Sequence, residues 1–107
     1  MRVPGAARAV LREDVGELCG VVRQMIERHG EIFLTRVYTP HEINYCSARK
    51  AATQHYAGRW AAKEAVLKAL GTGWSRDIKW RDVEVRNDIG GKPEIVLDGG
   101  ALEISRR

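Results

Sequence analysis

The sequence predicts an α+β fold in which helices pack on an antiparallel sheet. Residues 15–30 and 59–70 repeat their apolar side chains at the three- and four-residue spacing of a helix. Residues 78–97 instead show the alternation typical of strands, interrupted by a turn rich in Asn, Asp and Gly. A chain of 107 residues can bury one modest core, so we expect residues 1–107 to form a single domain.

The first predicted helix covers residues 15–30. Its apolar side chains recur at helical spacing and should face the core: Val15, Leu18, Val21, Val22, Met25 and Ile26. Asp14 is a suitable N-cap, and Glu17 three residues later completes a capping box. Asp14 therefore has a structural interpretation that requires no ligand.

A second helix start follows the short apolar segment at residues 31–38. Thr39 is a good N-cap, Pro40 fits the first helical position, and Glu42 completes a capping box. The basic residues at 49–50 are interpreted as part of a solvated connection to the next element.

The longest uninterrupted pattern runs from Gly58 to Gly73 and reads G-R-W-A-A-K-E-A-V-L-K-A-L-G-T-G. Because strong helix formers dominate it, we expect one amphipathic helix that ends in a left-handed Gly71. The side chains expected to face the core are Trp60, Ala61, Val66, Leu67 and Leu70. Glu64 and Lys68 lie one turn apart, and as a solvated ion pair they would contribute only about 0.2–0.5 kcal/mol.

The last third of the chain predicts a β-hairpin. Ile78 and Trp80 alternate, then Val83 and Val85 alternate on a shifted phase, which indicates a strand with a kink or bulge. Residues 87–91 form the turn, residues 94–97 form the second strand, and residues 101–104 begin another helix.

The composition limits the classes of partner. A net charge of +4 favours an anionic partner. We expect no nucleic acid, because the sequence lacks a basic face interleaved with aromatic residues, a zinc signature and a recognition-helix motif. No apolar run approaches the roughly 18 residues of a membrane span, and Met1–Val10 lacks the apolar core of a signal peptide. Cys19 and Cys46 are isolated thiols, which fits a cytoplasmic protein.

The stretch Trp60–Gly73 resembles the signature helix of the 4′-phosphopantetheinyl transferases, specifically the short holo-acyl-carrier-protein synthase type. That family carries an aromatic-A-A-K-E-A/S-x-x-K-A-x-G-T-G run. Asp14–Leu18 is similar to the family's D-x-x-E-I/L, and residues 82–93 are similar to its D-V-E-V and G-K-P segment. The resemblance extends over residues 14 to 100, and it implies the family's α+β fold.

The resemblance also implies an activity: transfer of 4′-phosphopantetheine from coenzyme A to a serine of apo acyl carrier protein, releasing 3′,5′-ADP. It implies Mg²⁺, coenzyme A as co-substrate, an acidic carrier protein as partner, and a homotrimer with its active sites between subunits. Mg²⁺ would be held by Asp14 and Glu64, and catalysis would depend on Glu64 and Lys68. The residues that would bind the coenzyme are Arg59, Lys63, Lys68, Gly71 and Gly73.

Two departures from the family pattern support an alternative. Residues 1–13 lack the G-I-G that precedes the family's aspartate, and the family's last strand is absent from this sequence. Separately, Gly20 stands where an arginine is often found, which would alter carrier docking, while Arg23 and Arg28 remain. The alternative is a catalytically silent member that acts as a structural or carrier-binding subunit.

Overall fold

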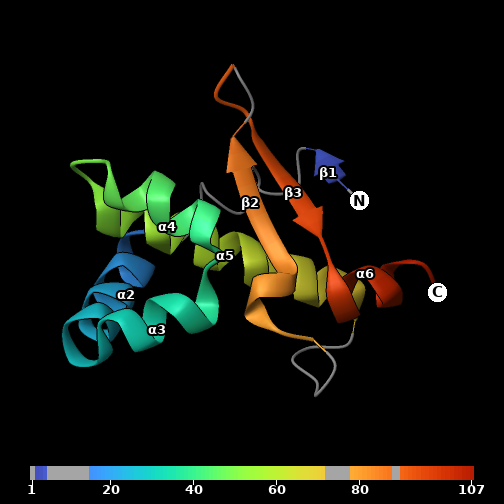
Figure 1. Cartoon of the computed structure of the whole chain (residues 1–107), viewed down its shortest axis with the longest axis horizontal. Helices are drawn as coiled ribbons and strands as arrows, with labels where there is room; N and C mark the ends of the chain where they lie inside the picture. The colour runs from blue at the N-terminus through green and yellow to red at the C-terminus, as the bar shows by residue number, and fades with distance from the viewer. Residues whose placement is uncertain (1, 5–14, 72–77, 88–89) are drawn as a thin grey trace.

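A computed structural model describes residues 2–4, 15–71, 78–87 and 90–107. Its central element is the long helix α5 (Ala52–Leu70), with shorter helices around the first half of α5 and a three-stranded sheet across the second half (Figure 1). The predicted arrangement, helices packed on an antiparallel sheet, is confirmed.

Three helices precede α5: α2 (Val15–His29), α3 (Glu31–Val37) and α4 (Pro40–Ser47). Gly30, with φ of 54°, separates α2 from α3 in a conformation that favours glycine. The predicted capping box at the start of α4 is present. Thr39 Oγ1 accepts a hydrogen bond from the Glu42 N–H at 3.2 Å, and Glu42 Oε1 accepts one from the Thr39 N–H at 2.9 Å.

Helix α5 begins at Ala52, earlier than the sequence pattern indicated, and continues through Gly58. Glycine costs about 1 kcal/mol relative to alanine inside a helix, and packing on both sides of α5 offsets this cost. The predicted amphipathic character holds within residues 58–70, where residues 62, 63, 66 and 67 are buried while residues 64, 65, 68 and 69 are not. The earlier turns of α5 lie outside that prediction. The predicted end is confirmed, because Gly71 has φ of 77° and its N–H caps the last turn.

The sheet is antiparallel in the order β1-β3-β2, with β1 (Arg2–Pro4), β2 (Val83–Asn87) and β3 (Pro93–Leu97). The predicted hairpin is confirmed by the pairing of β2 with β3. The predicted kinked strand is wrong, because the 3₁₀ turn η1 (Trp80–Asp82) precedes β2 and produces the phase shift. Helix α6 (Gly99–Ser105) follows β3, as expected, and the Asp98 carboxylate accepts a hydrogen bond from the Gly99 N–H.

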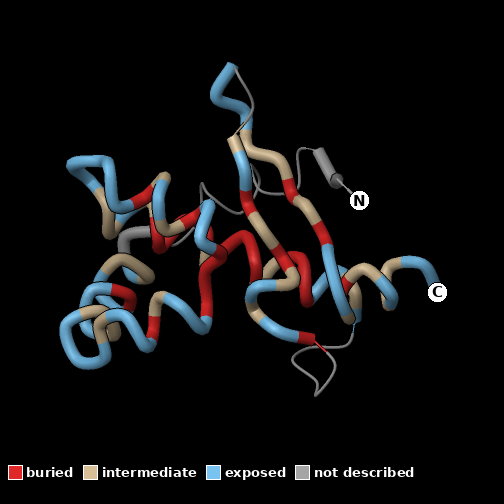
Figure 2. The backbone as a smooth tube through the Cα atoms, viewed as in Figure 1, coloured by how far each residue is buried: buried red, intermediate tan, exposed pale blue. Residues whose placement is uncertain are grey.

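Two apolar cores flank α5, and Figure 2 shows buried backbone along much of this helix. The sheet-side core joins α5 to the hairpin and α6 and contains Ala62, Val66, Leu67, Ile78, Val83, Val85, Ile95, Leu97 and Ala101. The helix-side core joins α5 to α2, α3 and α4 and contains Val22, Phe33, Val37, Tyr38, Cys46, Tyr56 and Ala57. Because α5 contributes to both cores, its orientation governs the rest of the fold.

Two predicted site residues, Asp14 and Gly73, lie outside the described ranges. Among the described helices, none is both long and apolar enough to cross a membrane.

Candidate active site

Two predicted site residues lie on the outer side of α5. Glu64 is half-buried and Lys68 is exposed, so both side chains reach solvent from the second half of the helix. The ion pair that their spacing suggested is not formed, and no other described residue forms an ion pair or hydrogen bond with Glu64. Among the described residues neither Glu64 nor Lys68 forms an ion pair, although they lie one turn apart. The carboxylate and the ammonium are therefore both available to a ligand that carries a metal ion and a phosphate.

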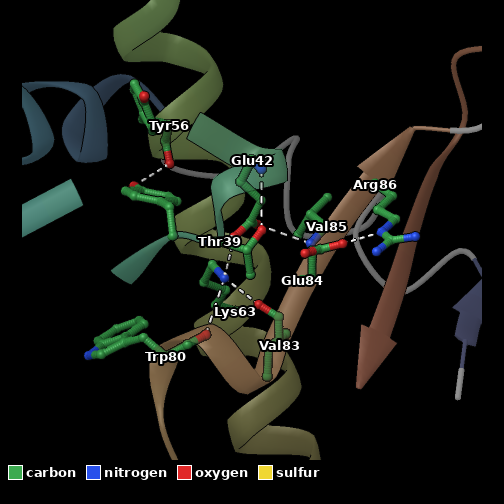
Figure 3. Close-up of polar contacts among 10 residues, drawn as sticks. Thr39, Glu42, Tyr56, Lys63, Trp80, Val83, Glu84, Val85 and Arg86 are labelled. Carbon is green, nitrogen blue, oxygen red and sulfur yellow. Dashed lines mark hydrogen bonds and ion pairs between the residues drawn. The ribbon is translucent and has the colours of Figure 1, made fainter. Parts of the chain in front are cut away.

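The neighbouring Lys63 points into the protein from a different face of the helix and is completely buried. Its Nζ forms an ion pair with Glu42 Oε1 at 2.8 Å and donates hydrogen bonds to the backbone carbonyls of Trp80 and Val83 (Figure 3). All three ammonium protons therefore have acceptors inside the protein. The predicted contact of Lys63 with a coenzyme phosphate has no support in this geometry, because the side chain is enclosed and its donors are used.

Burial lowers the pKa of Lys63, and the attraction of the Glu42 carboxylate opposes that shift. Lys63 is thus a structural cation. Sequence patterns alone did not indicate the partner of Lys63, since Glu42 was assigned only to the capping box of α4. Glu42 both completes the capping box and pairs with Lys63, because its Oε1 accepts from the Thr39 N–H and lies against Lys63 Nζ. Its Oε2 accepts from the Val85 N–H at 3.0 Å.

Arg59 lies one turn before Lys63 and is 6% exposed. Its Nη2 donates to Asn87 Oδ1 at 2.6 Å, and its guanidinium carbon lies 4.3 Å from the centre of the Tyr45 ring. The Arg59 Nε has no hydrogen-bond partner among the described residues. This nitrogen is enclosed by the protein, and an unsatisfied buried donor of this kind costs about 1–3 kcal/mol.

A second guanidinium contacts the same ring. Arg49 lies 3.4 Å from the centre of the Tyr45 ring, and the His55 ring meets Tyr45 edge-on at 5.6 Å. We call Arg49, His55 and Arg59 the basic cluster. Partial burial of His55 lowers its pKa, and repulsion from Arg59 and Arg49 lowers it further. The sequence interpretation had treated Arg49 as part of a solvated connection.

The comparisons with known proteins decide the family. Residues 19–106 match the family model described as the 4'-phosphopantetheinyl transferase superfamily. The chain belongs to this superfamily. The resemblance first seen at Trp60–Gly73 is thereby confirmed.

Named relatives of this transferase family give the same result. A holo-[acyl-carrier-protein] synthase of Koribacter versatilis is 44% identical over 85 residues, which are 79% of this chain and 68% of that protein. The synthase of Protochlamydia amoebophila is 53% identical over 76 residues, 71% of this chain and 62% of that protein. The chain thus spans about two thirds of the length of these relatives.

Solved structures of holo-[acyl-carrier-protein] synthases share the fold. The synthase from Neisseria meningitidis has a TM-score of 0.70 at 30% identity, covering 79% of this chain and 67% of that one. The synthase from Bacillus anthracis, in complex with CoA (3',5'-ADP), has a TM-score of 0.65 at 36% identity, covering 75% and 68%.

Within this transferase chain, the expected metal pair is only partly described. Glu64 is placed, whereas Asp14 is outside the described ranges. No group of three or more His, Cys, Asp or Glu side chains among the described residues is arranged to hold a metal. Glu64 still fits Mg²⁺, a hard cation that binds carboxylate oxygens, because its carboxylate is unpaired among those residues.

Gly71 is the only predicted coenzyme-binding glycine within the described ranges. It is exposed at the end of α5 and adopts a left-handed conformation. No described atom lies within 4 Å of the position that a Cβ would occupy, so it is the backbone conformation that favours glycine here.

An apolar cavity of about 470 Å³ opens between α2, α3, α5 and η1. Its walls include Phe33, Trp60 and Trp80, whose rings meet edge-on. The Trp60 Nε1 is buried and has no hydrogen-bond partner among the described residues. Trp60 therefore lies at the cavity rather than wholly inside the core, which refines the prediction that it faces a core.

Proposed function

We propose that this chain transfers the 4′-phosphopantetheine group from coenzyme A to a serine hydroxyl of an apo acyl carrier protein. The serine oxygen forms a bond to the phosphorus of the transferred group, the pyrophosphate P–O bond breaks, and 3′,5′-ADP leaves with the bridging oxygen. The serine proton is released to a base that the residues do not identify. The observation that carries the proposal is the family match over residues 19–106, with Glu64 and Lys68 on the exposed side of α5.

Lys68 is the residue we assign to the pyrophosphate. Negative charge grows on the leaving phosphate oxygens as the P–O bond breaks, and a nearby ammonium stabilises it. The exposed position of Lys68, with no ion pair to a described residue, leaves its charge available for this contact. Lys63 takes no part in coenzyme binding in this proposal.

Asp14 and Glu64 are the residues that would hold Mg²⁺. When bound, the cation would neutralise phosphate charge and orient the pyrophosphate. Hard carboxylate ligands of this kind suit Mg²⁺, and the unpaired Glu64 supports its half of the assignment.

The basic cluster is the site we assign to the outer phosphates of coenzyme A. The exposed Arg49 supplies a guanidinium that a ligand can reach, and the buried Arg59 adds a second positive charge on the same tyrosine ring. An arginine fork binds phosphate oxygens in a defined geometry, and a second nearby charge strengthens the attraction. Gly71 and Gly73 would allow the backbone to approach the coenzyme closely.

The carrier protein is proposed to dock on the exposed face of α2. Val21 and Arg28 lie two turns apart, so they share one helix face, and both are exposed. Ile32, at the start of the following helix α3, is 65% exposed and adds further apolar surface. An apolar side chain beside an arginine suits an acidic, amphipathic partner helix. We further propose that the chain forms the homotrimer of its family. We also propose a cytoplasmic location, where the free thiols of Cys19 and Cys46 would stay reduced.

A mass measurement tests the proposal. The chain is incubated with coenzyme A, Mg²⁺ and an apo carrier protein, and the carrier is weighed by mass spectrometry. The proposal expects the carrier to gain one phosphopantetheine group, and to gain none when coenzyme A is omitted. Carrier binding without a mass increase would instead support the silent, carrier-binding alternative.

A further inference from the structure

The buried Glu42–Lys63 pair connects four elements of the fold. Glu42 comes from α4 and Lys63 from α5, while their remaining hydrogen bonds reach η1 and β2 (Figure 3). Both side chains are 0% exposed. Between them they form one ion pair and bind four backbone groups, at Thr39, Trp80, Val83 and Val85.

Two of these backbone groups lie on an edge of the sheet that the described residues form. Among those residues, strand β2 is the last in the order β1-β3-β2, so half of its N–H and C=O groups point away from β3. The Val83 carbonyl binds Lys63 and the Val85 N–H binds Glu42, in place of hydrogen bonds to a further strand. The ion pair therefore fixes α5 to β2 through directional bonds.

Directional hydrogen bonds define the position of a helix more strictly than apolar packing does. Side chains in an apolar core tolerate small shifts, whereas an ammonium with three fixed acceptors defines the position of its helix. Lys63 is adjacent to Glu64 and one turn before Leu67, and Lys68 lies one turn after Glu64. A rotation of α5 about its axis would break the Lys63 contacts and swing Glu64 and Lys68 out of place together.

We propose that the Glu42–Lys63 pair is the positioning element of the active site, setting the rotation of α5 against the edge of β2 so that Glu64 and Lys68 face the substrate. Neither Glu42 nor Lys63 touches the substrate in this role. The inference rests on the proposed phosphopantetheinyl transfer.

A stabilising role alone is a weaker account of the pair. A buried ion pair contributes little net stability compared with well-packed apolar residues, because both charges lose their hydration. The pair also cannot be inverted, since the partners of Glu42 include two N–H donors and those of Lys63 include two carbonyl acceptors. The fixed arrangement of donors and acceptors around the pair therefore suits the task of orienting α5.

The test uses Glu42→Gln, which keeps the shape of the side chain but removes its charge and one acceptor. Leu97→Ala is the matched control, because it opens a cavity in the sheet-side core without touching the pair. Both variants are assayed at a temperature where circular dichroism shows each to be folded. We expect kcat of Glu42→Gln to fall about 10- to 100-fold with the KM for coenzyme A changed less than about 3-fold.

The control should keep kcat within about 2-fold, since its change acts on stability alone. In the Lys68→Ala background, Glu42→Gln should cost much less than in the wild type, because the residue it positions is already gone. An equal loss of kcat in Glu42→Gln and Leu97→Ala, or fully multiplicative losses with Lys68→Ala, would overturn the inference. If Glu42→Gln does not fold, Lys63→Arg replaces it with the same expectations, since a planar guanidinium cannot reproduce the three ammonium contacts.

A structural measurement separates this inference from the proposed function. Residual dipolar couplings give the orientation of α5 relative to the β2–β3 hairpin in the wild type and in Glu42→Gln. We expect α5 to change its orientation in the variant and to keep it in Leu97→Ala. If the wild type transfers nothing to the carrier, the proposed function fails, and these couplings alone decide: an unchanged α5 in Glu42→Gln would contradict the positioning role.

Discussion

Both sides of α5 carry charged residues, but the surroundings of these residues differ. On the inner side, Lys63 is buried and all of its donors are bound by the protein. On the outer side, Glu64 and Lys68 reach solvent and form no ion pair with each other. Lys63 and Glu64 are adjacent in sequence, yet Lys63 has protein partners while Glu64 has no ion pair or hydrogen bond among the described residues. We therefore assign Lys63 to structure and propose Glu64 and Lys68 for ligand binding.

The largest expected effect is the loss of stability on removing the buried Lys63 ammonium. Lys63→Ala leaves the Glu42 carboxylate buried without a counter-charge, so we expect the free energy of unfolding to fall by about 3–5 kcal/mol. Urea denaturation followed by circular dichroism measures the change. The outer-side variant Lys68→Ala should change it by no more than about 0.5 kcal/mol. Equal effects of the two substitutions would remove the distinction between the two sides.

The next largest effect comes from the outer side. Glu64→Gln removes the negative charge proposed to hold Mg²⁺, and we expect kcat for transfer to fall by about 100-fold or more while the fold stays intact. Glu103→Gln, an exposed carboxylate on α6, is the control and should leave transfer unchanged. Transfer at the wild-type rate by Glu64→Gln would exclude the metal assignment.

Lys68→Ala should lower kcat/KM for coenzyme A by about 10- to 100-fold, because one ammonium no longer stabilises the leaving phosphate. Carrier affinity, measured by isothermal titration calorimetry, should stay the same. Lost carrier affinity with normal coenzyme turnover would place Lys68 at the docking surface instead.

A smaller effect is expected in the basic cluster. In the free chain, burial and two guanidinium groups hold the pKa of His55 below its ordinary value. Coenzyme A added at saturating concentration should raise the pKa of His55, since phosphate charge near Arg49 and Arg59 offsets their repulsion. Proton NMR titration of the imidazole signals measures both values. The signals of His29, on α2 and outside the cluster, should not move. A pKa of His55 that is unchanged by coenzyme A would rule out phosphate binding at the cluster.

The thiols give the smallest effect. Burial raises the pKa of Cys46 to about 11, so its reactive thiolate is scarce at neutral pH, while Cys19 is partly exposed. A thiol reagent such as DTNB should therefore modify one cysteine per folded chain, and both after denaturation. Two rapidly reacting thiols in the folded chain would contradict the enclosed position of Cys46.

Local signals predicted much of the fold. The periodicity of α2, the capping box at Thr39, the left-handed Gly71 and the hairpin all depend on residues a few positions apart, and the structure confirms each. The start of α5 and the 3₁₀ turn at Trp80–Asp82 were not predicted, because packing between the two cores decides them. Gly58 in particular looked like a helix boundary and is an interior residue.

The candidate site was harder to predict for the same reason. The resemblance assigned Lys63 to coenzyme A, but its partner Glu42 lies 2.8 Å away in space and on a different helix. Nothing in the spacing of these two residues marks them as a pair. The basic cluster was partly missed as well, since Arg49 joins Arg59 only when α4 and α5 bring both against Tyr45.

A crystal structure of the chain soaked with coenzyme A tests the division of α5 into two sides most directly. We expect phosphate oxygens within hydrogen-bonding distance of Lys68 and of the basic cluster, with Lys63 Nζ still bound to Glu42. A coenzyme phosphate bound to Lys63, with Glu42 displaced, would contradict that division.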